Sequence, residues 1–186
     1  GNQVAYDFAT VPSKVLRHWI LQPEILQELS HHRRTGIALN RAEMEQLIAR
    51  EKFGRATKTM KQLFLSLVAL HACENPTKNM HHVIEKLHKK IFKHCAYVGE
   101  NYFEMSFFFF FYNDHAALYY TNMWSDVIAA DLFAYIDKHG IMNHEVGMQY
   151  VTEILSPGGS RNAYEMIKRF LGHPFHRKAF FEELSF

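Results

Sequence analysis

The chain has 186 residues, 48% of them hydrophobic and 15% aromatic, with only nine glycines and five prolines. This composition excludes collagen-like and disordered chains and predicts a well-filled core in a single domain. The formal charge is +2 with neutral histidines and rises by 13 if every histidine is protonated, so charge indicates little about partners at neutral pH. We expect no nucleic-acid partner.

The cysteines and the apolar runs exclude two further classes of protein. Cys73 and Cys95 show no CxxC spacing and cannot form a disulfide framework, although a single bridge between them stays open. No apolar run approaches the roughly 18 to 20 residues that span a bilayer. Residues 1–7 lack the basic and apolar regions of a signal peptide. We expect no membrane span and no leader.

Apolar side chains recur at helical spacing from Pro12 onward. The first helix carries one apolar stripe formed by Val15, Leu16, Trp19 and Ile20. Further helices are predicted from Pro23, over 41–52 with Asn40 as the cap, over 55–73 and over 79–95.

The second half of the chain begins with an unusual segment. Phe107 to Phe111 is an unbroken aromatic run, and we expect an irregular, buried segment over 96–114. Helices are then predicted over 115–139, ending at Gly140, over 143–155, over 160–171, and after Pro174. No run has the alternation of a strand, so the predicted fold class is all-α.

The pentapeptide 144–148 (HEVGM) looks like the start of a zinc-binding helix. In an HExxH motif, two histidines at i and i+4 bind zinc and the glutamate acts as general base. Here His144 and Glu145 are followed by Met148, a poor zinc donor, in place of the second histidine. The favoured interpretation is therefore a helix that begins after Asn143 as its cap.

Two other polar groupings have a structural and a functional interpretation. His81, Glu85 and His88 share a helix face and could offer metal ligands, but a solvated polar face is favoured. The run 31–34 (HHRR) and the segment 86–93 are locally basic. They could contact phosphate or an acidic protein, and exposed helix faces explain them equally well.

Ordered motifs along nearly the whole chain carry a family resemblance. They are 7–13 (DFATVPS) followed by Trp19, 32–36 (HRRTG), 119–120 (YY), 124–126 (WSD), 146–150 (VGMQY), 154–160 (ILSPGGS) and 170–172 (FLG). The chain thereby resembles the M3 zinc oligopeptidases, the family of thimet oligopeptidase, oligopeptidase A and mitochondrial intermediate peptidase. The resemblance implies a helical carboxy-terminal lobe that forms one wall of a peptide channel. Complete members are several times longer, with an HExxH helix upstream of the segment that starts here.

Positions that the resemblance links to zinc differ in this chain. The family's third zinc ligand, a glutamate, corresponds to Thr10, whose neutral hydroxyl zinc sites seldom use. A second family glutamate, further along the same helix, corresponds to Arg17, which replaces an anion by a cation. We expect no cofactor in this chain, whereas active family members hold zinc.

Positions that the resemblance links to substrate differ as well. Phe110 stands at the family's transition-state histidine, and His115 and Asn122 stand at substrate-binding tyrosines. Tyr119 and Tyr120 are retained as candidate substrate contacts. The chain thus lacks the family's zinc ligand, the second glutamate and the histidine that stabilises the transition state. These losses predict that the fold is retained and that zinc-dependent peptide hydrolysis is lost.

The predicted function is therefore a catalytically degenerate, M3-peptidase-like domain that serves as a structural or binding subunit of a larger assembly. One alternative is the carboxy-terminal fragment of an M3 zinc metalloendopeptidase that cleaves oligopeptides when joined to its HExxH-bearing part. Another is a non-catalytic peptide-binding module. The expected partners are other proteins or a separate amino-terminal lobe, with peptides as a further candidate. The resemblance favours a mitochondrial location, with a cytoplasmic one as the alternative.

Overall fold

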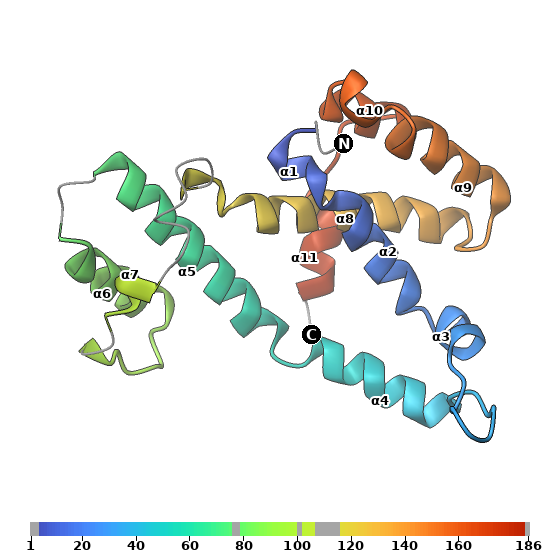
Figure 1. The fold of residues 1–186 in the computed structure, drawn as a ribbon, viewed down its shortest axis with the longest axis horizontal. Coiled ribbons are helices and arrows are strands. Elements are labelled where there is room, and N and C mark those ends of the chain that lie inside the picture. Colours follow the sequence, from blue (N-terminus) through green and yellow to red (C-terminus); the bar gives the residue numbers. More distant parts are fainter. Residues whose placement is uncertain (1–3, 76–78, 100–101, 107–115, 185–186) are drawn as a thin grey trace. The chain divides into compact units, whose positions relative to one another are not determined.

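A computed structural model describes residues 4–75, 79–99, 102–106 and 116–184. Across these ranges the chain forms helices joined by turns and contains no strand, which confirms the predicted all-α class (Figure 1). None of the helices in the same ranges combines the length and apolar character needed to cross a membrane. The predicted irregular segment around Phe107 to Phe111 lies outside the described residues.

The chain divides into two compact units, which are described separately. The first consists of Gly1–Arg55 and Ser125–Phe186, and the second of Ala56–Trp124. The boundaries fall at the first residue of α5 (Arg55–Glu74) and inside α8 (Thr121–His139). The single helical domain expected over 1–186 stays a prediction.

The first unit is built from helices of both chain ends. They are α1 (Tyr6–Ala9), α2 (Val11–Ile20), α3 (Pro23–Leu29), α4 (Arg41–Lys52), most of α8, α9 (His144–Tyr150), α10 (Ala163–Leu171) and α11 (Lys178–Leu184). A π-helix (Val151–Leu155) continues α9, and a short 3₁₀ helix (Gly158–Ser160) follows it. Helix α4 begins at Arg41 with Asn40 as its cap, as predicted, and Asn40 and Glu43 exchange hydrogen bonds in a capping box.

The core of the first unit joins sequence-distant helices. Its members are buried aliphatic and aromatic side chains of α1, α2, α8, α9, the π-helix and α10, among them Phe8, Val15, Leu132 and Phe170. The predicted stripe of α2 is only half correct, because Leu16 is 52% and Ile20 37% exposed. Val11 and Val15, one turn apart, are the residues of α2 that enter the core.

The second unit has its own smaller core. It contains α5, α6 (Met80–Ile91), α7 (Phe103–Ser106) and a 3₁₀ turn (Ala116–Leu118). Helices α5 and α6 bury Phe64, Leu65, Val68, Ala69, Ile84 and Leu87 against one another. Cys73 and Cys95 are both free thiols, which decides against the bridge that the sequence left open.

Helix boundaries differ from the predicted ones at several points. Helix α6 ends at Ile91 instead of residue 95, and α10 begins at Ala163 instead of residue 160. Helix α8 begins at Thr121, six residues later than expected, after the 3₁₀ turn and a two-residue turn. The stretch predicted as one helix over 143–155 widens into a π-helix at Val151, a local change that hydrophobic periodicity does not encode. Gly140 follows α8 with a φ of +100°, a conformation that favours glycine.

The core of the first unit predicts the effect of truncating Phe170. This ring is fully buried and meets Tyr135 and Tyr150 at centroid distances of 5.0 and 5.5 Å. We expect Phe170→Ala to lower the free energy of unfolding by about 3 to 5 kcal/mol, because it leaves a cavity between two rings. Urea titration followed by Trp19 fluorescence, in a Trp124→Phe background, measures the change in this unit.

Phe53→Ala is the matched control. Phe53 lies in the same unit but is 83% exposed, so its truncation should change the free energy of unfolding by less than about 0.5 kcal/mol. Equal effects of the two variants would contradict the assignment of Phe170 to the core.

Candidate functional site

Thr10 occupies the corner between α1 and α2. Its side chain makes no capping hydrogen bond, and its carbonyl accepts from the Lys14 amide at 3.1 Å and from the Ser13 hydroxyl at 2.8 Å. The corner is fixed from the other side by Ser125 of α8, whose fully buried hydroxyl donates to the Asp7 carbonyl at 2.7 Å. The backbone at position 10 is therefore fixed by hydrogen bonds, but the Thr10 side chain is exposed and neutral.

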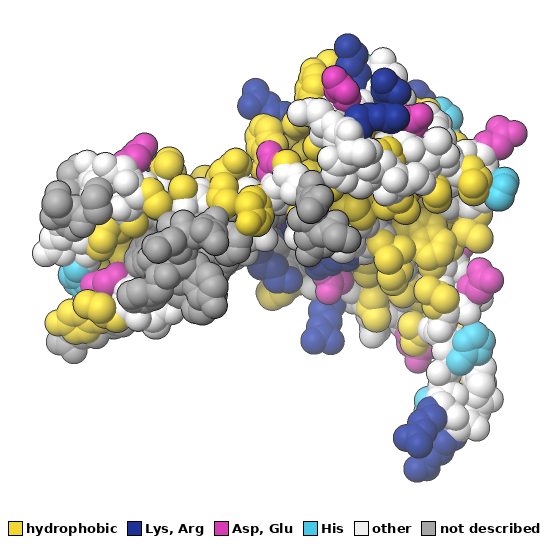
Figure 2. Space-filling model, turned by 45° about the horizontal axis from the view of Figure 1, so that its top comes forward, with side chains coloured by type: hydrophobic (Ala, Val, Ile, Leu, Met, Phe, Trp, Pro, Cys, Tyr) yellow, Lys and Arg dark blue, Asp and Glu magenta, His cyan; other side chains and the backbone are white. Residues whose placement is uncertain are grey.

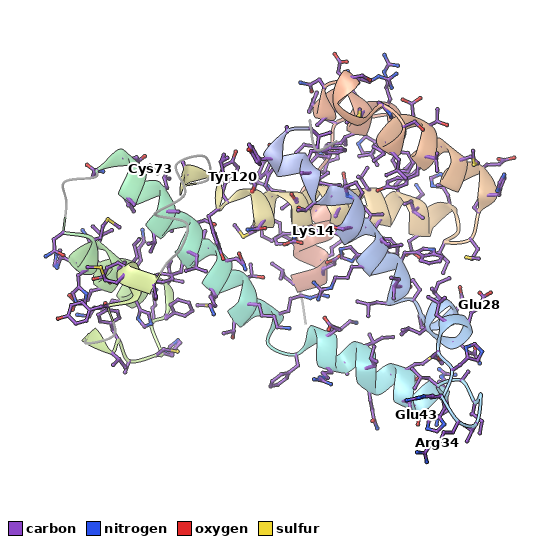
Figure 3. All side chains as sticks on the ribbon, in the orientation of Figure 1. Lys14, Glu28, Arg34, Glu43, Cys73 and Tyr120 are labelled. Carbon is purple, nitrogen blue, oxygen red and sulfur yellow. The ribbon has the colours of Figure 1, made fainter. Side chains whose placement is uncertain are left out.

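Three basic residues follow Thr10 on one face of α2. Lys14, Arg17 and His18 stand at i, i+3 and i+4, so their side chains are neighbours on the helix. Lys14 forms a partly buried ion pair with Asp126 of α8 (Figure 3). We call these three residues and their acidic partners the charged face of α2.

Arg17 pairs with a different helix. Its guanidinium lies 2.6 Å from the carboxylate of Glu51 on α4, and its side chain is 65% exposed. An ion pair this exposed contributes at most about 1 kcal/mol to stability. At the position where the resemblance places a second glutamate, the chain thus holds a cation that has an acidic partner of its own.

His18 forms the inner end of the charged face. Its ring stacks on Phe133 with centroids 5.4 Å apart, and its Nδ1 lies 3.4 Å from the Glu183 carboxylate of α11. Arg55 donates to the backbone carbonyl of Glu183 at 3.1 Å and lies 3.4 Å from its carboxylate. Burial, and then the charge of Arg55, lowers the pKa of His18 to about 4. Burial also raises the pKa of Glu183, against the opposing effect of Arg55.

A cavity lies beside this cluster. It has a volume of about 450 Å³, within the range of ligand pockets, and its walls include His18, Arg55, Glu183, Ile48 and Phe133. Three polar residues of this wall, His18, Arg55 and Glu183, already contact one another. The cavity lining therefore combines apolar side chains with an ion-paired cluster of α2, α11 and the first residue of α5.

The charged face of α2 does not fit a zinc ion. The resemblance places a zinc-ligating glutamate at Thr10, where the structure holds an exposed hydroxyl followed by the cations Lys14 and Arg17. Zinc prefers thiolate, imidazole and carboxylate ligands, and nearby cations oppose its binding. Nor does any group of three or more His, Cys, Asp or Glu side chains in the described ranges come together as a metal site.

The predicted substrate contacts lie in the second unit. The Tyr119 hydroxyl bonds to the side chain of Gln62, and burial raises its pKa. Tyr120 is 44% exposed. The side-chain amide of Asn122 donates to the Tyr119 carbonyl at 3.5 Å. Phe110 and His115 lie outside the described residues. Of the retained pair, Tyr120 alone presents much of its surface to solvent.

The other sequence motifs have structural roles. The Asn143 side chain accepts from the amides of Glu145 and Val146, which confirms it as the cap of α9. The solvated face predicted for α6 is wrong for two of its members. His81 contacts Glu104 of α7 at 3.1 Å, and His88 is half-buried with its ring 5.2 Å from that of Tyr97.

Sequence reasoning missed most of the charged face. The helical spacing of Lys14, Arg17 and His18 was visible, but their partners Asp126 and Glu183 stand more than a hundred residues away in the chain. No local pattern indicates such pairs.

The pKa of His18 predicts an acid-dependent loss of stability. His18 titrates near 6.5 when unfolded and near 4 when folded, so the unfolded state binds more protons between these values. Stability from the neutral ring is present above pH 6.5 and is lost as pH falls toward 4. We expect His18→Phe, which keeps a ring against Phe133, to reduce this acid loss by up to about 3 kcal/mol.

Urea unfolding from pH 4 to 7, followed by Trp19 fluorescence, measures the slope of the free energy of unfolding against pH. The contribution of Glu183 to this slope has the opposite sign, because its raised pKa gives stability in acid that is lost as pH rises. His144→Phe, at an exposed position, is the control and should leave the slope unchanged. An unchanged slope in His18→Phe would refute a buried, neutral His18.

Comparisons with known proteins match the whole chain to one family. The model of peptidase family M3 matches residues 1–186. Oligopeptidase A of Salmonella typhimurium is 33% identical over 174 residues, covering 91% of this chain and 25% of the relative. Oligopeptidase A of Escherichia coli is 32% identical over 173 residues, covering 91% of this chain and 25% of the relative. Mitochondrial intermediate peptidase of Malassezia globosa is 26% identical over 175 residues, 92% of this chain and 21% of the relative.

The similarity covers one part of each relative. The chain spans about a quarter of the length of the curated relatives that it matches. The family as a whole is zinc-dependent, whereas the residues of the charged face do not suit zinc. With its helical fold and its match over the full length, the chain belongs to peptidase family M3.

Proposed function

We propose that this chain is a catalytically degenerate M3-peptidase domain that acts as a structural or binding subunit of a larger assembly. The observation that carries the proposal is the charged face of α2. Thr10 offers zinc a neutral hydroxyl, and the next turns of the helix present Lys14 and Arg17.

The acidic residues near this face support the same function. Glu51 and Asp126 are each paired with a cation of α2, and Glu183 is held by Arg55 and His18. A carboxylate that neutralises a lysine or arginine is less available to bind a metal or to orient a metal ligand. Binding zinc here would require breaking these pairs and bringing a divalent cation close to basic side chains.

A second candidate is the carboxy-terminal part of an active M3 zinc metalloendopeptidase. Identity of 33% to a relative named oligopeptidase A favours it, as does the chain's coverage of only a quarter of that relative. In that case the rest of the polypeptide would supply HExxH. A third candidate, a non-catalytic peptide-binding module, is supported by the exposure of Tyr120.

The relatives support the proposed location and partners. A mitochondrial location is proposed because mitochondrial intermediate peptidase is among them, with the cytoplasm as the alternative because a probable cytosolic oligopeptidase A is also among them. The partner proposed is another protein or a separate amino-terminal lobe, because the chain is much shorter than its relatives.

The test is zinc content and peptide cleavage by the native polypeptide that contains this chain, isolated with whatever it binds. We expect less than about 0.1 zinc per chain, because a site with a neutral ligand and adjacent cations binds zinc poorly. We expect no cleavage of a quenched fluorescent peptide that Escherichia coli oligopeptidase A cleaves in parallel. Stoichiometric zinc with cleavage would overturn the proposal in favour of the second candidate.

Thr10→Glu in the same polypeptide sharpens the test, with Thr10→Gln as the uncharged control of similar size. We expect neither variant to gain zinc or activity, since Lys14 and Arg17 remain beside the new carboxylate. A gain of zinc in Thr10→Glu alone would show that the other ligands are intact and would count against degeneracy.

A further inference from the structure

The connection between α3 and α4 forms an ordered turn, which we call the basic turn (residues 31–37). The His32 amide donates to the Ile37 carbonyl at 2.9 Å, and the Gly36 amide donates to the His32 carbonyl at 2.8 Å. Thr35 adds a contact from its hydroxyl to Nδ1 of His32 at 2.9 Å. Gly36 has a φ of +70°, which lets the chain reverse there. The segment is therefore a hydrogen-bonded turn and not an exposed helix face.

Two arginines lie at the outer end of this turn. Arg33 and Arg34 are exposed, and within the described part of the chain neither forms an ion pair or hydrogen bond through its side chain. Figure 3 places Arg34 at the tip of the connection, while Glu28 lies on α3. Figure 2 shows Lys or Arg and His side chains gathered at this end of the first unit.

The two carboxylates of the first turns of α4, which follow the basic turn in sequence, are already engaged elsewhere. Glu43 accepts from the Asn40 amide at 2.8 Å as part of the cap of α4, and Glu45 pairs with Arg41 at 2.9 Å. The basic turn thus differs from the charged face of α2, where every cation has an acidic partner. The turn fixes the backbone at both arginines, and their exposed guanidinium groups remain open to an anion from outside.

The amount of charge favours one class of partner. Anionic membranes recruit clusters of about four to eight basic residues, and nucleic-acid binding needs an extended basic stripe. Two adjacent arginines are too few for either. They do match a short run of carboxylates, because each guanidinium can bind one carboxylate through two parallel hydrogen bonds. Ile37, 69% exposed on the same turn, offers an apolar contact beside them.

We propose that the basic turn is a docking site for an acidic segment of a partner protein, with Arg33 and Arg34 as its anchors. This inference does not rest on the loss of zinc chemistry, because the turn is separate from the charged face of α2 in sequence and in its contacts. It holds equally for a degenerate subunit and for a fragment of an active peptidase.

The experiment measures binding of a fluorescein-labelled hexaglutamate peptide to the chain by anisotropy, at low salt of about 20 mM, where the Debye length is long. We expect saturable binding that weakens at about 150 mM salt. Arg33→Gln with Arg34→Gln should weaken binding at least about fivefold, because both anchors are lost.

Arg169→Gln with Arg177→Gln is the matched control, which removes the same charge from exposed positions of the same unit. It should weaken binding less than about twofold if the turn is the site. Far-UV circular dichroism verifies that both double variants remain helical. Absence of saturable binding, or an equal loss in the two double variants, would overturn the proposal.

Two further probes distinguish the partner class. Phosphatidylserine vesicles and a short duplex DNA are titrated under the same conditions, with the same two double variants. We expect the vesicles and the DNA to bind more weakly than the peptide. Tighter binding of vesicles or DNA that depends on Arg33 and Arg34 would replace the acidic segment by that partner.

Discussion

The first unit depends on one buried hydrogen bond between distant parts of the chain. Ser125 is the polar side chain that is fully buried within the described residues, and it donates to the carbonyl of Asp7, 118 positions earlier. A buried hydroxyl without a partner would cost about 1 to 3 kcal/mol, so α8 and the α1–α2 corner are held in one relative position. Thr10 and the start of α2 are placed by this contact.

The same placement explains the polarity of α2. Val11 and Val15 enter the core, and the adjacent face brings Lys14, Arg17 and His18 against acidic residues of α4, α8 and α11. Each pair is individually weak because it is partly solvated. Together they leave little unbalanced charge, and a divalent cation would disturb every one of them. The corner at which the resemblance places a zinc ligand is here maintained by hydrogen bonding and ion pairing.

Local signals in the sequence accounted for most of the helices but little of the charged face. Asn40 and Asn143 each cap a helix as predicted, because a cap acts within three residues of its own position. Leu16 and Ile20 belong to the predicted apolar stripe but are exposed, since periodicity shows that a stripe exists without showing how much of it is covered. The π-helix at Val151 and the pairing of His18 with Glu183 depend on packing between distant elements, which no short window contains.

The two basic groups of the first unit show how context decides what a charge can do. On α2, cations lie beside a core whose neighbouring helices supply carboxylates, so the charges are used in holding the unit together. At the basic turn the backbone forms its own hydrogen bonds, and Glu43 and Glu45 are engaged within α4 and its cap. Among the residues that the structure describes, Arg33 and Arg34 therefore have no structural partner. Exposed arginines reduce the free energy of unfolding little. A turn that fixes their backbone lowers the conformational entropy lost when an anion binds. A chain whose formal charge is nearly balanced can therefore still present a local, directional site for an acidic partner.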